Sequence, residues 1–156
     1  EEIGFDADPA TLAIAYARAL GDHGELYPGA RELLEVLADG PARMALVTNG
    51  LSEVQRARIA RHRLDQYFDA VVISAEVGAA KPGSAIFDLT FAALGRPDSA
   101  GAVMIGDNLP SDIKGGADYG IATCWYNPDG RRVDLDVTIT HEVRTLAEIH
   151  DVATGV

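Results

Sequence analysis

The chain has 156 residues, of which 47% are apolar, and this length and composition suffice for one domain with a hydrophobic core. The net charge of −11 argues against a nucleic-acid partner, because the phosphate backbone would be repelled. No apolar run reaches membrane-spanning length, and the single Cys124 cannot form an internal disulfide, so we expect no membrane partner and a cytoplasmic location.

Apolar residues recur with helical periodicity in some segments and form short continuous runs in others. The periodic segments predict helices over residues 9–20, 29–38, 84–94 and 143–152, and Ser52 as a cap predicts another over residues 52–62. The short runs predict buried strands over residues 44–47, 70–73, 102–105 and 121–125, and a short fifth strand over 137–139. Because single helices separate the strands, the predicted fold is α/β with a doubly wound parallel sheet and right-handed crossovers.

The first predicted strand ends in the turn Thr48-Asn49-Gly50, directly before a helix. The Thr48 hydroxyl and the backbone amides of Asn49 and Gly50 would lie near the positive N-terminus of that helix. Parallel sheets bind ligands at such strand ends, and this arrangement suits a phosphate oxygen. The alternative interpretation is a turn that merely leads into the helix, for which Ser52 is the expected cap.

The second predicted strand is followed by Lys81-Pro82. The chain contains eleven arginines but only two lysines, so a lysine at this place indicates a need for a compact ammonium group. Pro82 restricts the backbone of the preceding residue and thereby directs the Lys81 side chain. The alternative interpretation is a solvated surface lysine.

The third predicted strand ends in GDNLPSD, residues 106–112. Gly106 permits a sharp turn, after which the carboxylates of Asp107 and Asp112 can converge. Carboxylate oxygens suit Mg²⁺, which needs one or two of them together with phosphate and water. The alternative interpretation is a local Asx-turn followed by an aspartate that caps a helix.

The three turns together bring a hydroxyl, an ammonium group and a carboxylate pair to successive strand ends. Phosphoryl transfer needs a phosphate cradle, a cation opposite the developing charge and a metal ion. The sequence therefore predicts a site for phosphate chemistry that uses Mg²⁺.

The segments LVTNG, AAKPGSAIF and GDNLPSD resemble the second, third and fourth motifs of the haloacid dehalogenase-like (HAD) phosphatases, in the branch with an early helical cap. This resemblance implies that Thr48 and Lys81 are catalytic residues that hold the transferring phosphoryl group. It also implies that Asp107 is a direct Mg²⁺ ligand and that Asp112 supports the metal site. VVISAEVG and ATCWYN are most similar to pyrimidine 5′-nucleotidase-like members, although phosphosugar phosphatases of the branch share much of this sequence.

The stretch GFDADPAT, residues 4–11, is the candidate for the first motif of the family, DxDxT, whose first aspartate is the nucleophile. Few residues precede Asp6, and two of them are charged, which disfavours a buried central strand. Asp8-Pro9 is typical of a helix start, with Asp8 as the cap and Pro9 in the first turn. We therefore expect Asp8 to be a helix cap and the nucleophilic aspartate not to be in this chain.

The resemblance also implies a division of the chain. Residues 1–24 would be the C-terminal remnant of the helical cap with its linker, and residues 25–156 an HAD-like Rossmannoid core without its first strand. That strand would lie between the strands ending at Thr48 and Asp107. We expect the chain to be the C-terminal part of a longer protein, or to associate with a complementary N-terminal segment or subunit.

The function expected from this resemblance is Mg²⁺-dependent hydrolysis of a phosphomonoester through an aspartyl-phosphate. The substrate would be a small phosphorylated molecule, for example a nucleoside monophosphate, and this chain alone would be inactive. Two alternatives remain: a phosphosugar phosphatase of the same branch, and a catalytically incomplete module that binds phosphate or a partner.

Several other residues are expected to be structural. The basic residues between positions 56 and 63 predict a solvated helix face, Trp125 and Tyr126 are expected to pack in the core or at its rim, and Cys124 is expected in the core.

Overall fold

A computed structural model describes residues 8–154 of the chain. The helices are α1 (Pro9–Asp22), α2 (Ala30–Ala38), α3 (Ser52–His62), α4 (Ser74–Val77), α5 (Ser84–Ala93), α6 (Lys114–Tyr119) and α7 (Leu146–Thr154). The strands are β1 (Ala45–Thr48), β2 (Ala70–Ile73), β3 (Val103–Gly106), β4 (Ala122–Tyr126) and β5 (His141–Val143). Short turns of 3-10 helix, η1 (Leu64–Tyr67) and η2 (Ser99–Gly101), and a π-helical turn, η3 (Leu109–Ile113), complete the elements. None of the helices between residues 8 and 154 is long and apolar enough to cross a membrane.

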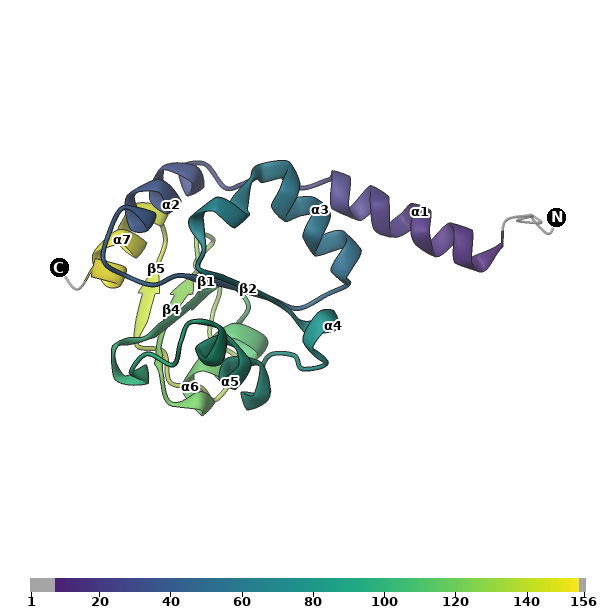
Figure 1. Cartoon of the computed structure of the whole chain (residues 1–156). Helices are drawn as coiled ribbons and strands as arrows, with labels where there is room; N and C mark the ends of the chain where they lie inside the picture. The colour runs from purple at the N-terminus through teal and green to yellow at the C-terminus, as the bar shows by residue number, and fades with distance from the viewer. Residues whose placement is uncertain (1–7, 155–156) are drawn as a thin grey trace.

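Every strand pair between these elements is parallel, as predicted. β1 pairs with β2, and Thr48 lies opposite Ile73 at the end of that pair. β3, β4 and β5 form a second group in that order. In Figure 1, α2 and α7 lie on one side of the strands and α5 and α6 on the other. The predicted α/β fold with helices on both faces of parallel strands is confirmed.

The predicted strand over residues 137–139 is wrong, because the fifth strand begins four positions later than predicted, at His141. Val137 and Ile139 instead pack against the buried cluster of Leu109, Ile113 and Trp125. The backbone N–H of Thr123 donates to the Thr140 hydroxyl at 3.0 Å, and the N–H of Thr140 donates to the Thr123 hydroxyl at 3.0 Å. These side-chain bonds replace a backbone ladder until the ladder of β5 begins.

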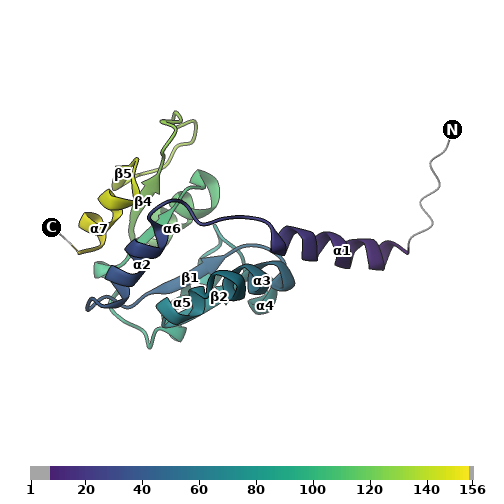
Figure 2. The same cartoon turned by 90° about the horizontal axis from the view of Figure 1, so that it is seen from above.

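Asp8 opens α1 as its N-terminal cap. Its carboxylate accepts hydrogen bonds from the backbone N–H of Thr11 at 3.1 Å and from the Thr11 hydroxyl at 3.2 Å, and Pro9 lies in the first turn. The cap predicted at Asp8 is therefore confirmed, whereas Asp6 lies outside the described residues. Helix α1 packs along α3 and projects away from the strands in both views (Figures 1 and 2). The division of the chain after residue 24 stays a prediction.

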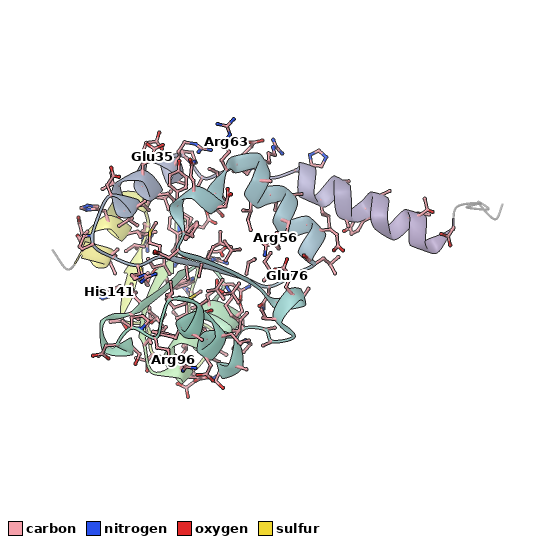
Figure 3. The ribbon with its side chains drawn as sticks, in the orientation of Figure 1. Glu35, Arg56, Arg63, Glu76, Arg96 and His141 are labelled. Atoms are coloured by element: carbon pink, nitrogen blue, oxygen red, sulfur yellow. The ribbon has the colours of Figure 1, made fainter. Side chains whose placement is uncertain are left out.

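Helix α3 begins at Ser52, but Ser52 is not its cap. The cap residue is Leu51, which makes no side-chain cap bond, and the Ser52 hydroxyl donates to Glu76 of α4. Arg56 also donates to Glu76, with Nε 2.8 Å from Oε1, and Figure 3 shows these two side chains meeting between α3 and α4. The hydrogen bonds from Arg56 and then from Ser52 lower the pKa of Glu76 to about 2. Polar side chains therefore fasten α3 to α4.

The other basic residues of α3 also have partners within the chain. Arg58 donates to the carbonyl oxygen of Leu20 at 3.2 Å, and the His62 ring lies 2.9 Å from the carbonyl oxygen of Gly24. The expected solvated face is therefore not a free cationic surface, because part of it holds the end of α1 and the linker that follows.

A groove separates β1 from β3. Within residues 8–154, neither strand pairs with another strand on the side that faces the groove. The groove has a volume of about 660 Å³ and is lined by both strands. Leu33, Leu34 and Leu37 of α2 line it, as do Phe87 and Phe91 of α5. The parallel strands therefore form two groups around an open, largely apolar space.

Candidate active site

A buried ion pair between Lys81 and Asp112 lies at one end of the groove. Lys81 Nζ is 2.8 Å from Asp112 Oδ1, and the two side chains are only 7% and 9% exposed. The same ammonium group donates to the carbonyl oxygen of Val47 at 2.7 Å. Val47 belongs to β1 and Asp112 follows β3, so the carboxyl ends of both strands meet at Lys81. An ammonium group has three N–H donors, which leaves one that can bind an anion.

The side chain of Asn49 fixes the backbone of Lys81. Its Nδ2 donates to the Lys81 carbonyl oxygen at 2.8 Å, and its Oδ1 accepts from the Lys81 backbone N–H at 3.0 Å. The backbone N–H of Gly50 donates to the Ser74 hydroxyl at 2.9 Å. These contacts tie the turn after β1 to the segment after β2. The Gly50 amide, which was predicted to bind phosphate, thus holds the protein frame of the site together with the Asn49 side chain. Phosphate binding by the backbone amide of Asn49 stays a prediction.

Thr48 lies at the carboxyl end of β1, as predicted, but it does not line the same hollow as Lys81. It lines a second hollow of about 400 Å³, together with Gln55 and Arg58 of α3. Val47 lines both hollows. The structure thus brings Lys81, Asp107 and Asp112 into one groove and places the Thr48 hydroxyl beside it.

Both carboxylate oxygens of Asp112 are held by donors. Oδ1 accepts from the Ser111 hydroxyl at 3.0 Å in addition to Lys81, and Oδ2 accepts from the Asn108 backbone N–H at 3.2 Å. A Cβ atom on Gly106 would lie 2.6 Å from Asp112 Cγ, so the end of β3 needs a glycine to admit this side chain. Because its oxygens are occupied, Asp112 is suited to support a metal site through its neighbours.

Asp107 presents the opposite situation. Its side chain is exposed, and no donor among residues 8–154 holds its carboxylate. Its backbone carbonyl oxygen, in contrast, accepts from Trp125 Nε1 at 3.2 Å and from Arg131 Nη2 at 2.8 Å. The backbone of Asp107 is therefore fixed while its carboxylate remains available as a ligand.

The carboxylate oxygens of the site fit Mg²⁺. The described part of the chain has no group of three or more His, Cys, Asp or Glu side chains that could hold an ion alone. Mg²⁺ in phosphate-handling sites is bound by one or two carboxylates, with the remaining positions taken by substrate oxygens and water. The free carboxylate of Asp107 matches that ligand set, and Asp112, whose oxygens already have donors, would support it.

Two residues of the site carry no recognisable signal in the sequence. Trp125 appears in the sequence as a core residue, and its ring is indeed fully buried, yet its N–H also bonds Asp107. Arg131 lies in a polar loop, and its partner is a backbone carbonyl, which any residue type would offer. Cys124 is buried, and burial raises the pKa of its thiol to about 11, so the expected core role holds.

Residues 2–120 match the family model of the haloacid dehalogenase-like hydrolases. The chain belongs to this family. It is 39% identical over 145 residues to the pyrimidine 5′-nucleotidase YjjG of Escherichia coli, an alignment that covers 93% of this chain and 64% of YjjG. It is 34% identical to a ribulose-1,5-bisphosphate 5-phosphatase of Halopiger xanaduensis, over 92% of this chain and 63% of that enzyme.

Solved HAD structures share the fold. The magnesium-bound HAD-hydrolase YfnB of Bacillus subtilis superposes with a TM-score of 0.86 and is 33% identical, over 97% of this chain and 66% of YfnB. The Rossmannoid HAD fold expected from the sequence is therefore confirmed. The chain spans slightly less than two thirds of the length of these HAD relatives.

Proposed function

We propose that the complete protein is a Mg²⁺-dependent phosphomonoester hydrolase that acts on a small phosphorylated substrate, with a pyrimidine nucleoside monophosphate as the first candidate. The observation that carries this proposal is the buried Lys81–Asp112 pair, which shares one groove with the exposed carboxylate of Asp107. The similarity to the nucleotidase YjjG supports the choice of substrate class.

The protein groups have distinct roles in this proposal. The free N–H of Lys81, with the Thr48 hydroxyl beside the groove, holds phosphoryl oxygens and stabilises the negative charge that develops on them. Asp107 ligates Mg²⁺, and Asp112 holds the ammonium group of Lys81 in place. When bound, Mg²⁺ would offset the negative charge of the phosphoryl oxygens and orient the phosphoryl group.

We further propose that the attacking aspartate arrives on an extended segment that fills the groove between β1 and β3. Three features support this: the two unpaired strand edges, the apolar side chains from α2 and α5, and the position of Lys81 where both strands end. An aspartate at the carboxyl end of a strand parallel to both would lie at that point. On this view, the present chain without such a segment is inactive.

The reaction then proceeds in two displacements. An oxygen of the aspartate attacks phosphorus, the bond from phosphorus to the ester oxygen breaks, and the ester oxygen takes a proton from solvent and leaves as the alcohol; the water of the second step returns a proton to solvent. Water then attacks the aspartyl-phosphate, and inorganic phosphate leaves while the carboxylate is restored.

Phosphate release by the complete protein tests this proposal. With Mg²⁺ and a panel of pyrimidine nucleoside monophosphates, Asp107→Ala should abolish release, whereas Asp118→Ala should retain it, because Asp118 is an exposed partner of Lys114 on α6. Full activity of Asp107→Ala would overturn the assignment. Acid quench during turnover, followed by mass spectrometry, should find the phosphoryl group on an aspartate outside residues 8–154; its presence on a described aspartate would refute the groove-strand part.

Assays on the complete protein also distinguish two alternative functions. The similarity to the ribulose-1,5-bisphosphate phosphatase favours a phosphosugar substrate as second candidate, which faster release from phosphosugars than from nucleotides would establish. The open groove favours a non-catalytic binding module as third candidate. Binding of beryllofluoride, a phosphoryl mimic, by a complete protein that releases no phosphate from either substrate class would establish that function.

A further inference from the structure

Two side chains from separate segments converge on one backbone atom of the proposed metal site. Trp125, on β4, and Arg131, in the loop after β4, both donate to the carbonyl oxygen of Asp107, at 3.2 and 2.8 Å. The guanidinium carbon of Arg131 lies 5.7 Å from the centre of the Trp125 ring, so the two donors also contact each other through a cation–π interaction.

The indole is held rigidly. Trp125 is fully buried and packs with Leu109 and Ile113, which belong to the turn η3 that follows Asp107. The ring therefore contacts the metal-site turn through both its apolar surface and its N–H. A movement of Asp107 relative to β4 would disturb both contacts at once.

Arg131 is exposed at its side chain, but its backbone is anchored by a fully buried Asn127. The Asn127 amide group accepts from the Arg131 N–H at 2.8 Å and donates to the Arg131 carbonyl oxygen at 2.9 Å. Asn127 is itself held by Glu142, at 2.7 Å, and by a backbone bond to Val143 at 2.8 Å. This network fixes the point from which the arginine reaches Asp107.

We infer that Trp125 and Arg131 are positioning residues for Asp107: together they set the orientation of its backbone and so aim its free carboxylate at the Mg²⁺ ion. This inference rests on the proposed function only in so far as Asp107 is the Mg²⁺ ligand. The carbonyl carbon and the side chain of a residue share the same Cα atom, so fixing the carbonyl restricts where the carboxylate points. Groups that orient a metal ligand typically contribute 10-fold to 100-fold in metal affinity.

The test is Mg²⁺ binding measured by calorimetry on the complete protein, at a temperature where each variant is folded by circular dichroism. Trp125→Phe keeps the ring and removes the N–H donor, and Arg131→Ala removes the cationic donor. Each should raise the Kd for Mg²⁺ by about 10-fold. Arg131→Lys keeps a cationic donor and should recover part of the loss.

Matched controls are available in the next residue of each segment. Tyr126→Phe and Arg132→Ala alter neighbouring side chains that do not bond Asp107, so they should keep the wild-type Kd. Wild-type Mg²⁺ affinity in both folded Trp125→Phe and folded Arg131→Ala would overturn the inference, as would a wild-type protein that binds no Mg²⁺. Weakened binding in these variants, in a protein that releases no phosphate, would support the inference while refuting the proposed function.

Discussion

Asn49 and Lys81 exchange two hydrogen bonds, in which the side-chain amide of the asparagine pairs with both backbone groups of the lysine. The two hydrogen bonds resemble those between residues of neighbouring strands, except that one partner is a side chain. It joins the turn after β1 to the loop after β2, and it sets the point from which the Lys81 side chain enters the groove.

Replacing Asn49 should therefore loosen Lys81. Asn49→Ala should lower the free energy of unfolding by about 1 kcal/mol, the net value of ordinary hydrogen bonds, and should reduce phosphate release by the complete protein. Asn49→Asp keeps the acceptor for the Lys81 N–H and loses the donor to its carbonyl, so an intermediate loss is expected. Urea denaturation and a phosphate assay measure the two effects. Wild-type values for Asn49→Ala would mean that other contacts hold the lysine.

The buried pair of Lys81 and Asp112 predicts an asymmetry between single and double variants. Lys81→Met should lower the free energy of unfolding by about 3–5 kcal/mol, because it leaves a buried carboxylate without its cation. Adding Asp112→Asn removes that charge and should restore much of the stability, but not the phosphatase activity.

The exposed pair of Lys114 and Asp118 is the control for this comparison. Its atoms lie 2.7 Å apart, but the side chains are 38% and 56% exposed. Lys114→Met should cost only about 0.3–0.5 kcal/mol, as is typical of such helix pairs. Equal losses for the buried and the exposed lysine, measured by denaturant titration, would contradict a buried ion pair at the groove.

The glycine at the end of β3 predicts a steric effect. In Gly106→Ala the new Cβ would lie 2.6 Å from Asp112 Cγ, which forces the carboxylate away from Lys81. We expect a loss of about 1–3 kcal/mol in stability and a large loss of phosphate release. Gly101→Ala is the matched control, since a Cβ there meets nothing within 4 Å and should change neither quantity. An active, stable Gly106→Ala protein would show that the turn can move freely.

The contact between Arg56 and Glu76 predicts a dependence of stability on pH. The pKa of Glu76 is lowered to about 2 in the folded protein, below its ordinary value near 4.3 in an unfolded chain. Its stabilising contribution is therefore complete above the unfolded pKa and is lost as the pH falls towards 2.

Urea midpoints measured from pH 6 to pH 3 check this dependence. The wild-type midpoint should fall more steeply below pH 4.5 than that of Glu76→Gln, which lacks the titrating group. Glu53→Gln, an exposed change in the first turn of α3, should keep the wild-type slope. Parallel slopes for the wild type and Glu76→Gln would refute the shift.

The sequence predicted most of the fold because the signals for it are local. The bounds of β2 were predicted to the residue because it is a clear apolar run. Those of α3 were also predicted, but from Ser52 as the cap, a role that Ser52 does not have. The misplaced fifth strand shows where local signals are insufficient. Val137 and Ile139 have the alternation of a strand, but their side chains pack on the cluster around Trp125 and the segment does not pair as a strand.

Of the candidate site, only the charged side chains could be predicted from the sequence. Lys81, Asp107 and Asp112 stand out by residue type and by their places after strands, and they do line one groove. The hydrogen bond from Arg131 to Asp107 was not predictable, because its acceptor is a backbone carbonyl oxygen, which every residue has. The use of the Asn49 side chain to hold Lys81 was hidden for the same reason.

The open space between β1 and β3 links activity to the completeness of the sheet. Among residues 8–154, the strands form a pair and a triplet, and Lys81 links the two groups at the groove through its bonds to Val47 and Asp112. A strand that fills the groove would join both groups into one continuous sheet and would complete the catalytic site in the same step. A protein whose groove is unfilled would then lack phosphatase activity, so activity would report that the sheet is complete.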